Sequence, residues 1–155
     1  MIFLYDERMK TIVLIHRKEN LKKCSIWPLH VRPDFDFFFF PDEMPVLDPA
    51  RLIRLGIGGQ PLGPCDLQKE LVILDATWRL VQKMEEACVD IPVRSIGQYQ
   101  TAYPRVSDQN TDPFQGLATV EALFCAHLEL GLPTQGILQH YYWREDFLRI
   151  NRLEG

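Results

Sequence analysis

Apolar, β-branched runs alternate along this chain with segments whose apolar positions recur at helical spacing. Residues 10–16 and 70–75 are continuous apolar runs with charged flanks, which is typical of parallel strands covered on both faces. Residues 31–41 contain five phenylalanines and predict another strand of this kind. Residues 91–96, entered through Pro92, predict the next strand.

Helix signals fall between these runs. Asp48 followed by Pro49 is a helix-start signal, and it predicts a short helix over residues 48–55 that ends in the glycine-rich turn 56–59. After Asp75 the pattern changes to a single apolar stripe at helical spacing. The stripe consists of Leu80, Val81, Met84, Ala87 and Cys88.

The rest of the chain completes an alternating order. Residues 118–131 predict a helix ended by Gly131, residues 137–149 predict a last helix, and residues 97–115 form a long polar loop. Strands that alternate with helices predict an α/β fold, here with a mainly parallel sheet flanked by helices. The length of 155 residues suits a single domain. Asp75 then stands at the carboxyl end of a strand, where open α/β sheets bind ligands.

Composition narrows the class of protein. Apolar residues make up 46% of the chain and charged residues 25%, as in ordinary globular proteins, and no apolar run is long enough to span a bilayer. Charges within residues 1–8 do not suit a secretory signal, so we expect a cytoplasmic protein with no membrane partner. The cysteines form no C-x-x-C pair and the histidines show no metal-binding spacing, so no metal is predicted. Cys88 and Cys125 lie in apolar stretches and are expected to be core thiols.

Charge is unevenly distributed. Taken over the whole chain, the net charge of −4 argues against a nucleic-acid partner. From Arg8 to Arg32, however, seven Lys or Arg accompany a single acid, Glu19, whereas from Asp108 onward seven acids accompany three arginines. The first of these segments is therefore the candidate surface for phosphate contacts.

Four short segments stand out: residues 22–25 (KKCS), 74–78 (LDATW), 116–122 (GLATVEA) and 142–151 (YWREDFLRIN). In this order they resemble segments of the RNA aminocarboxypropyltransferases that modify small-subunit ribosomal RNA. Residues 22–25 (KKCS) are similar to the family's K-K/R-C-T/S, and residues 74–78 (LDATW) to the D-x-[ST]-W signature shared with the DTW-domain enzymes, which modify tRNA. Residues 116–122 (GLATVEA) resemble the L-S-[ST]-x-E-A helix start, and residues 142–151 (YWREDFLRIN) the closing W-G-x-x-F-x-x-x-N. The resemblance covers roughly residues 10–151.

Two segments depart from the ribosomal family. After Ser25 that family continues with Gly and lysines, whereas this chain has residues 26–28 (IWP). Between Pro92 and Leu117 the family's short A-x-N-P segment is replaced by a longer loop with residues 103–105 (YPR), which is similar to the Tyr-Arg region of the DTW enzymes. The ends of the chain favour ribosomal RNA and the middle favours tRNA, so both RNA partners stay open.

The resemblance implies an activity, a donor and a set of site residues. It implies a SPOUT-like fold with a C-terminal trefoil knot in one domain, 1–155, in which residues 10–65 are an N-terminal part and residues 66–155 bind the cofactor. It implies an enzyme that transfers a 3-amino-3-carboxypropyl group from S-adenosylmethionine to N3 of a uridine or modified uridine, without a metal. The implied catalytic residues are Asp75 and Trp78. The implied cofactor-binding residues are Ser25, Leu74, Val93, Gln115, Leu117 and Thr119. The implied RNA-binding residues are Lys22, Lys23, Arg79 and Arg105. The oligomeric state stays open.

Other interpretations remain at this stage. A SPOUT-type RNA methyltransferase would share the donor but transfer its methyl group, and a non-catalytic RNA-binding or ribosome-assembly module would share only the fold. A flavodoxin-like or nucleotide hydrolase domain is the least favoured, because the spacing of residues 56–59 is not that of a phosphate loop. Asp75 itself has a purely structural alternative, as the cap of the helix that begins near Thr77.

Overall fold

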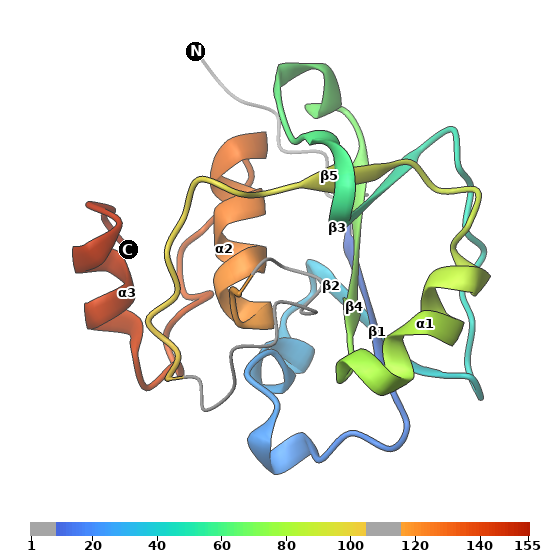
Figure 1. Cartoon of the computed structure of the whole chain (residues 1–155), viewed down its shortest axis with the longest axis horizontal. Coiled ribbons are helices and arrows are strands. Elements are labelled where there is room, and N and C mark those ends of the chain that lie inside the picture. The colour runs from blue at the N-terminus through green and yellow to red at the C-terminus, as the bar shows by residue number, and fades with distance from the viewer. Residues whose placement is uncertain (1–8, 105–115) are drawn as a thin grey trace.

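Five parallel strands form one sheet at the centre of the protein (Figure 1). The computed structural model describes residues 9–104 and 116–155. The strands are β1 (Thr11–His16), β2 (Phe35–Phe40), β3 (Leu52–Pro61), β4 (Glu70–Asp75) and β5 (Val93–Ser95), in the spatial order β2-β1-β4-β3-β5. The α-helices are α1 (Trp78–Ala87), α2 (Thr119–Leu130) and α3 (Arg144–Ile150). Three short 3-10 turns are η1 (Leu21–Lys23), η2 (Trp27–Val31) and η3 (Pro64–Asp66).

Successive side chains of the central strands face opposite layers, because side chains alternate along a strand. Ile12 and Leu14 of β1 belong to the cluster that packs beneath α1 together with Met84. Val13 and Ile15 belong to the larger cluster on the α2 side. All six residues of β1 are buried, so the continuous apolar run reflects a strand with two covered faces.

Helix α3 forms an outer layer beyond α2 (Figure 1). The rings of Phe124 in α2 and Phe147 in α3 meet edge to face with centroids 6.2 Å apart, and both side chains are fully buried. Gly131 ends α2 with a φ of 68°, a left-handed conformation that glycine adopts without steric cost. The predicted stop of this helix is therefore confirmed.

Most predicted elements are confirmed. The sequence anticipated strands at β1, β2, β4 and β5 and helices at α1 and α2, and the structure contains a single α/β domain with a parallel sheet. The last helix is shorter than predicted and begins at Arg144 rather than near Ile137. Cys88 and Cys125 are buried thiols, as expected.

The predicted helix over residues 48–55 is wrong, as is the glycine turn after it, because Leu52–Pro61 is strand β3. Asp48 does start a turn: its side chain accepts a hydrogen bond from the backbone N–H of Ala50 at 3.0 Å, and its carbonyl accepts one from Leu52 at 3.1 Å. The chain then inserts between β4 and β5. Pairing on both sides satisfies its backbone and outweighs the local helix signal.

Glycines in β3 serve the pairing with β5. A side chain at Gly59 would place its Cβ 2.1 Å from the carbonyl oxygen of Val93, so only glycine permits this approach. The register shifts between Leu55 and Gln60, which makes residues 56–59 a bulge inside the strand. The glycine pattern thus marks close strand packing.

The sheet combines strands from both predicted parts of the domain. β1, β2 and β3 come from residues 10–65 and β4 and β5 from residues 66–155, and β4 lies between β1 and β3. Within the described part of the chain, no helix has both the length and the apolar character needed to cross a bilayer.

Candidate functional site

Asp75 lies at the carboxyl end of β4, where its half-buried carboxylate is held by side chains from two distant segments. The hydroxyl of Thr119, the first residue of α2, donates to Oδ1 at 2.7 Å. The thiol of Cys24 donates to Oδ2 at 2.9 Å. Each oxygen retains acceptor capacity beyond these bonds, because a carboxylate has about four acceptor positions. The two donors therefore orient the group and leave it able to bind a further donor.

Ser25, the residue after Cys24, belongs to the same cluster. Its hydroxyl oxygen accepts the backbone N–H of Val120 at 3.2 Å, one of the N–H groups that the first turn of a helix leaves without a partner. The N–H of Thr119 has no acceptor among the described residues and carries the positive end of the dipole of α2. The site therefore places a carboxylate beside a helix start that favours anions.

Asp75 does not cap helix α1. The N-cap residue Thr77 makes no capping bond with its side chain, and its backbone N–H donates instead to Oε1 of Glu19 at 2.7 Å. Glu19 is the one acid in the basic N-terminal segment, and it ties the loop after β1 to the turn after β4. The structural alternative for Asp75 as a helix cap is thus not what the structure contains.

The electrostatics of the site keep Cys24 protonated. Burial, the nearby charge of Asp75 and the hydrogen bond to it raise the pKa of the Cys24 thiol from 9.0 to about 12. A thiol with this pKa is a hydrogen-bond donor at neutral pH and a poor nucleophile. Cys24 is therefore a positioning residue for Asp75.

Glu121 anchors a second segment to the start of α2. Its buried carboxylate accepts the backbone N–H groups of Ala118 at 2.8 Å and Ala102 at 2.9 Å, and the hydroxyl of Thr101 at 2.6 Å. Residues 102 and 118 thus share one carboxylate. Glu121 therefore has a structural role: it joins residues 101 and 102 to the start of α2.

We call residues 97–104 the strap, because they run from β5 across α2 and towards α3 (Figure 1). The hydroxyl of Tyr99 donates to Glu129 of α2. The side chain of Asn151 accepts the N–H of Gln100 and donates to its carbonyl, both at 2.8 Å. These bonds explain two residues of the closing motif physically: Phe147 packs α3 on α2, and Asn151 fixes the strap.

The predicted cofactor-binding residues lie in different parts of the fold. Ser25 and Thr119 lie at Asp75, as described above. The side chains of Leu74 and Leu117 are buried in the core on opposite sides of the sheet. Val93 pairs with Arg54 at the start of β5, two strands away from β4. Gln115 lies outside the described residues. Among the described members of this set, Ser25 and Thr119 are the two that join the hydrogen-bonded cluster at Asp75.

The structure describes some of the predicted catalytic and RNA-binding residues and not others. Trp78 begins α1 just after Asp75, and its side chain lies outside the described part of the structure. Lys22 and Lys23 are exposed on η1, immediately before Cys24. Arg79 is exposed in the first turn of α1, and Arg105 lies outside the described residues. The lysine pair therefore adjoins the Asp75 site.

Sequence reasoning missed Cys24 and Glu19 as site residues. Cys24 was visible as part of the KKCS segment, but no local pattern pairs it with a carboxylate 51 positions away. Glu19 was visible as a lone acid among bases. Within residues 9–104 and 116–155, no group of three His, Cys, Asp or Glu side chains is placed to hold a metal.

The fold and the site together define a class: an α/β domain whose polar side chains gather where parallel strands end, the usual ligand edge of such sheets. The chain is similar in structure to the SAM-dependent rRNA:acp-transferase Tsr3 from Vulcanisaeta distributa, with a TM-score of 0.72 and 18% sequence identity. The match covers 93% of this chain and 79% of that one. It establishes a shared fold. No protein-family model matches the sequence, and neither does any curated protein sequence.

Proposed function

We propose that this protein is an enzyme that transfers the 3-amino-3-carboxypropyl group of S-adenosylmethionine to N3 of a uridine or modified uridine in small-subunit ribosomal RNA. One observation carries the proposal: Cys24-Ser25, Asp75 and Thr119, from three of the segments that resemble the aminocarboxypropyltransferases, meet through hydrogen bonds at one strand end. The likeness in fold to an rRNA:acp-transferase supports it independently.

The site residues fit the amino-acid portion of such a donor. Asp75 offers acceptor positions to an ammonium group, and the N–H of Thr119 at the start of α2, which has no acceptor among the described residues, offers a donor to a carboxylate. These two groups are adjacent in the structure, as an amino acid requires. The sulfonium supplies an activated leaving group, so no covalent nucleophile is needed, in keeping with the protonated state of Cys24.

The transfer forms a bond from N3 of the base to the carbon next to sulfur on the methionine side. The bond between that carbon and sulfur breaks, and methylthioadenosine leaves with the electron pair. The proton of N3 must also depart, and accepting it is the alternative role for Asp75, in place of binding the ammonium group. The remaining task of the chain is to hold the base and the carbon in line.

A double-label experiment tests the reaction. The protein is incubated with ribosomal RNA and donor labelled either in the carboxyl group or in the methyl group. Carboxyl label entering RNA with release of methylthioadenosine supports the proposal. Methyl label alone would instead identify a methyltransferase, and the absence of both labels together with no donor binding by calorimetry would identify a non-catalytic module.

Asp75→Asn is the matched mutational test. Because it removes the negative charge that would bind the ammonium group or accept the proton, and keeps the size of the side chain, turnover should fall by about 100-fold or more. Asp90→Asn changes an exposed carboxylate just after α1 and should leave turnover intact. Full activity of the Asp75 variant would remove this residue from the mechanism.

The choice of RNA and the details of the fold belong to the same proposal. Purified ribosomal RNA and tRNA, offered separately, distinguish the ribosomal substrate from the tRNA alternative. A SPOUT-like knot stays a prediction of the resemblance.

A further inference from the structure

An aromatic cluster formed by Tyr103, Tyr142 and Trp143 lies on the surface where the strap meets the start of α3. The ring of Trp143 contacts Tyr142 with centroids 4.8 Å apart and Tyr103 with centroids 5.2 Å apart, both edge to face. Tyr142 is nevertheless 86% exposed and Tyr103 is 43% exposed. Rings this open contribute little to the core, so their place on the surface calls for another explanation.

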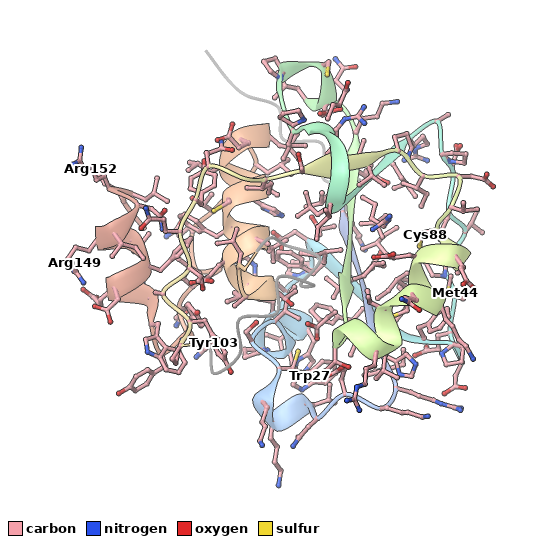
Figure 2. All side chains as sticks on the ribbon, viewed as in Figure 1. Trp27, Met44, Cys88, Tyr103, Arg149 and Arg152 are labelled. Carbon is pink, nitrogen blue, oxygen red and sulfur yellow. The ribbon has the colours of Figure 1, made fainter. Side chains whose placement is uncertain are left out.

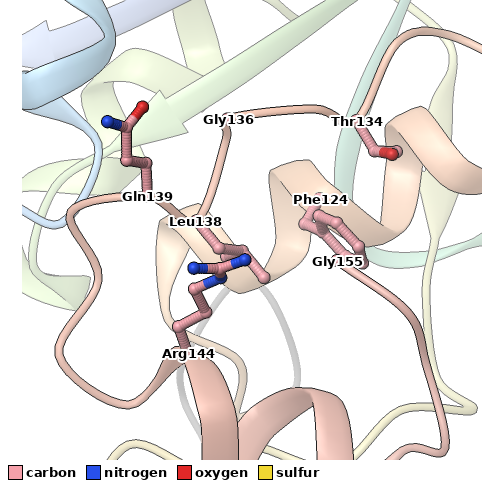
Figure 3. A pocket seen from close by; sticks show the side chains of 7 residues that line it. All are labelled: Phe124, Thr134, Gly136, Leu138, Gln139, Arg144 and Gly155. Carbon is pink, nitrogen blue, oxygen red and sulfur yellow. The ribbon is translucent and has the colours of Figure 1, made fainter.

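A cavity of about 190 Å³ is lined in part by Arg144, the residue that directly follows Trp143 of the cluster (Figure 3). Phe124 and Leu138 supply apolar walls, and Thr134, Gln139 and Arg144 supply polar groups. Arg144 extends from the start of α3 towards Leu138. Its guanidinium has no hydrogen-bond or ion-pair partner among residues 9–104 and 116–155. A half-buried cation that has no partner in the described part of the chain favours an anionic ligand.

The strap links this surface to the Asp75 site. Ala102 and Ala118 bind the same carboxylate of Glu121. Tyr103, the next residue of the strap, is therefore close to the start of α2, where Thr119 contacts Asp75. Tyr103 is held further by its backbone N–H, which donates to Thr101 at 2.9 Å. Figure 2 shows Tyr103 and Trp27 in the lower half of the molecule, the half in which β4 ends in Figure 1.

We infer that the aromatic cluster and the Arg144 cavity form a subsite for an unpaired nucleotide of the RNA strand, next to the nucleotide that is modified. The inference rests on the proposed function. Tyr142 supplies an exposed ring face for a base, Gln139 an amide for a base edge, and Arg144 a cation for the adjoining phosphate. Aromatic rings beside an arginine are the usual elements of single-strand recognition.

The chemistry selects RNA over an apolar partner. A protein-docking patch of aromatic rings would leave the guanidinium of Arg144 without a counterpart, whereas a nucleotide offers a flat ring and a negative charge a few ångströms apart.

The test uses the full chain and a five-nucleotide single-stranded RNA that carries 2-aminopurine beside a uridine. Stacking on a ring quenches the 2-aminopurine fluorescence, and titration gives the affinity. Tyr142→Ala should remove the quenching and weaken binding about fivefold or more. Arg144→Gln should lower the salt slope of log K by about 0.7, the contribution of one phosphate contact in a single strand.

Two variants serve as controls. Tyr142→Phe keeps the ring and should quench as the unchanged protein does. Arg149→Gln removes a cation from the same helix, one whose side chain is 72% exposed and paired with Asp146, and should have no effect on quenching. Calorimetry with S-adenosylmethionine should give the same donor affinity for every variant, which also shows that each is folded.

The outcomes separate the subsite from the proposed function. Unaltered quenching in Tyr142→Ala, an unaltered salt slope in Arg144→Gln, or no RNA binding by the unchanged protein would each overturn the subsite, whatever the donor result. Uridine monophosphate binding as tightly as the pentanucleotide would also overturn it, in favour of a site for a free nucleotide. Loss of quenching in Tyr142→Ala with no donor binding by any protein would leave the subsite standing and overturn the proposed transferase.

Discussion

Asp75→Asn should change the chemistry of Cys24, 51 positions away along the chain. The pKa of this thiol is raised to about 12 first by burial, then by the charge of Asp75 and by the hydrogen bond that it donates to Asp75. The substitution removes the charge and weakens the bond but leaves the burial. The pKa of Cys24 should therefore fall, while it remains above the ordinary value of 9.0.

The magnitude follows from the fraction of thiolate. At pH 9 a thiol with a pKa of about 12 is ionised to about 0.1%, and this fraction rises about tenfold for each unit by which the pKa falls. Alkylation by iodoacetamide proceeds through the thiolate, so its rate at pH 9 reports this fraction. A fall in the pKa of one unit should make Cys24 react about tenfold faster.

The measurement needs a background without the exposed thiol of Cys65, so Cys65→Ser is included in every protein. Cys88 and Cys125 are buried and react slowly, and mass spectrometry of peptides identifies the modified position. Asp90→Asn in the same background controls for the loss of one negative charge elsewhere. An alkylation rate at Cys24 that is equal in Asp75→Asn and Asp90→Asn would refute the contact, and with it the geometry proposed for the site.

Two further predictions concern the fold and the RNA surface. Burial lowers the pKa of His127 from 6.5 to about 4, so the unfolded chain binds this proton more strongly, and the folded state should lose about 3 kcal/mol as the pH falls from 6.5 to 4. Urea unfolding at pH 7 and pH 4.5 should show a smaller pH effect in His127→Gln than in His140→Gln, an exposed control, and equal effects would contradict the assignment. Replacing both Lys22 and Lys23 by Glu should weaken RNA binding and reduce its salt dependence, because both are exposed beside the site, and filter binding at several salt concentrations checks this. Unchanged binding would exclude that surface.

Local patterns predicted the elements whose environment is uniform along their length. The run in β4 is apolar throughout because the strand is covered by α1 on one face and by α2 on the other. Gly131 marked the end of α2 because a left-handed residue is needed there. These features depend on residues a few positions apart, so a single sequence carries them.

Strand β3 shows where local patterns fail. Leu52, Ile53 and Leu55 suit one face of a helix, yet in the structure Leu52 faces the α1 side and Ile53 and Leu55 face the α2 side. The same three residues are compatible with a helix and with a strand. The pairing with β4 and β5 decides between them, and those partners lie far along the chain.

The sequence by itself determined that the protein is an α/β domain, which runs are strands, and that Asp75 stands at a strand end beside a helix start. Only the tertiary structure decided that Cys24 and Thr119 hold that carboxylate, and that Val93 lies away from it. The physical reason is the range of the forces: side-chain periodicity and capping act within a few residues, whereas the neighbours of a strand end are set by the burial of the whole sheet.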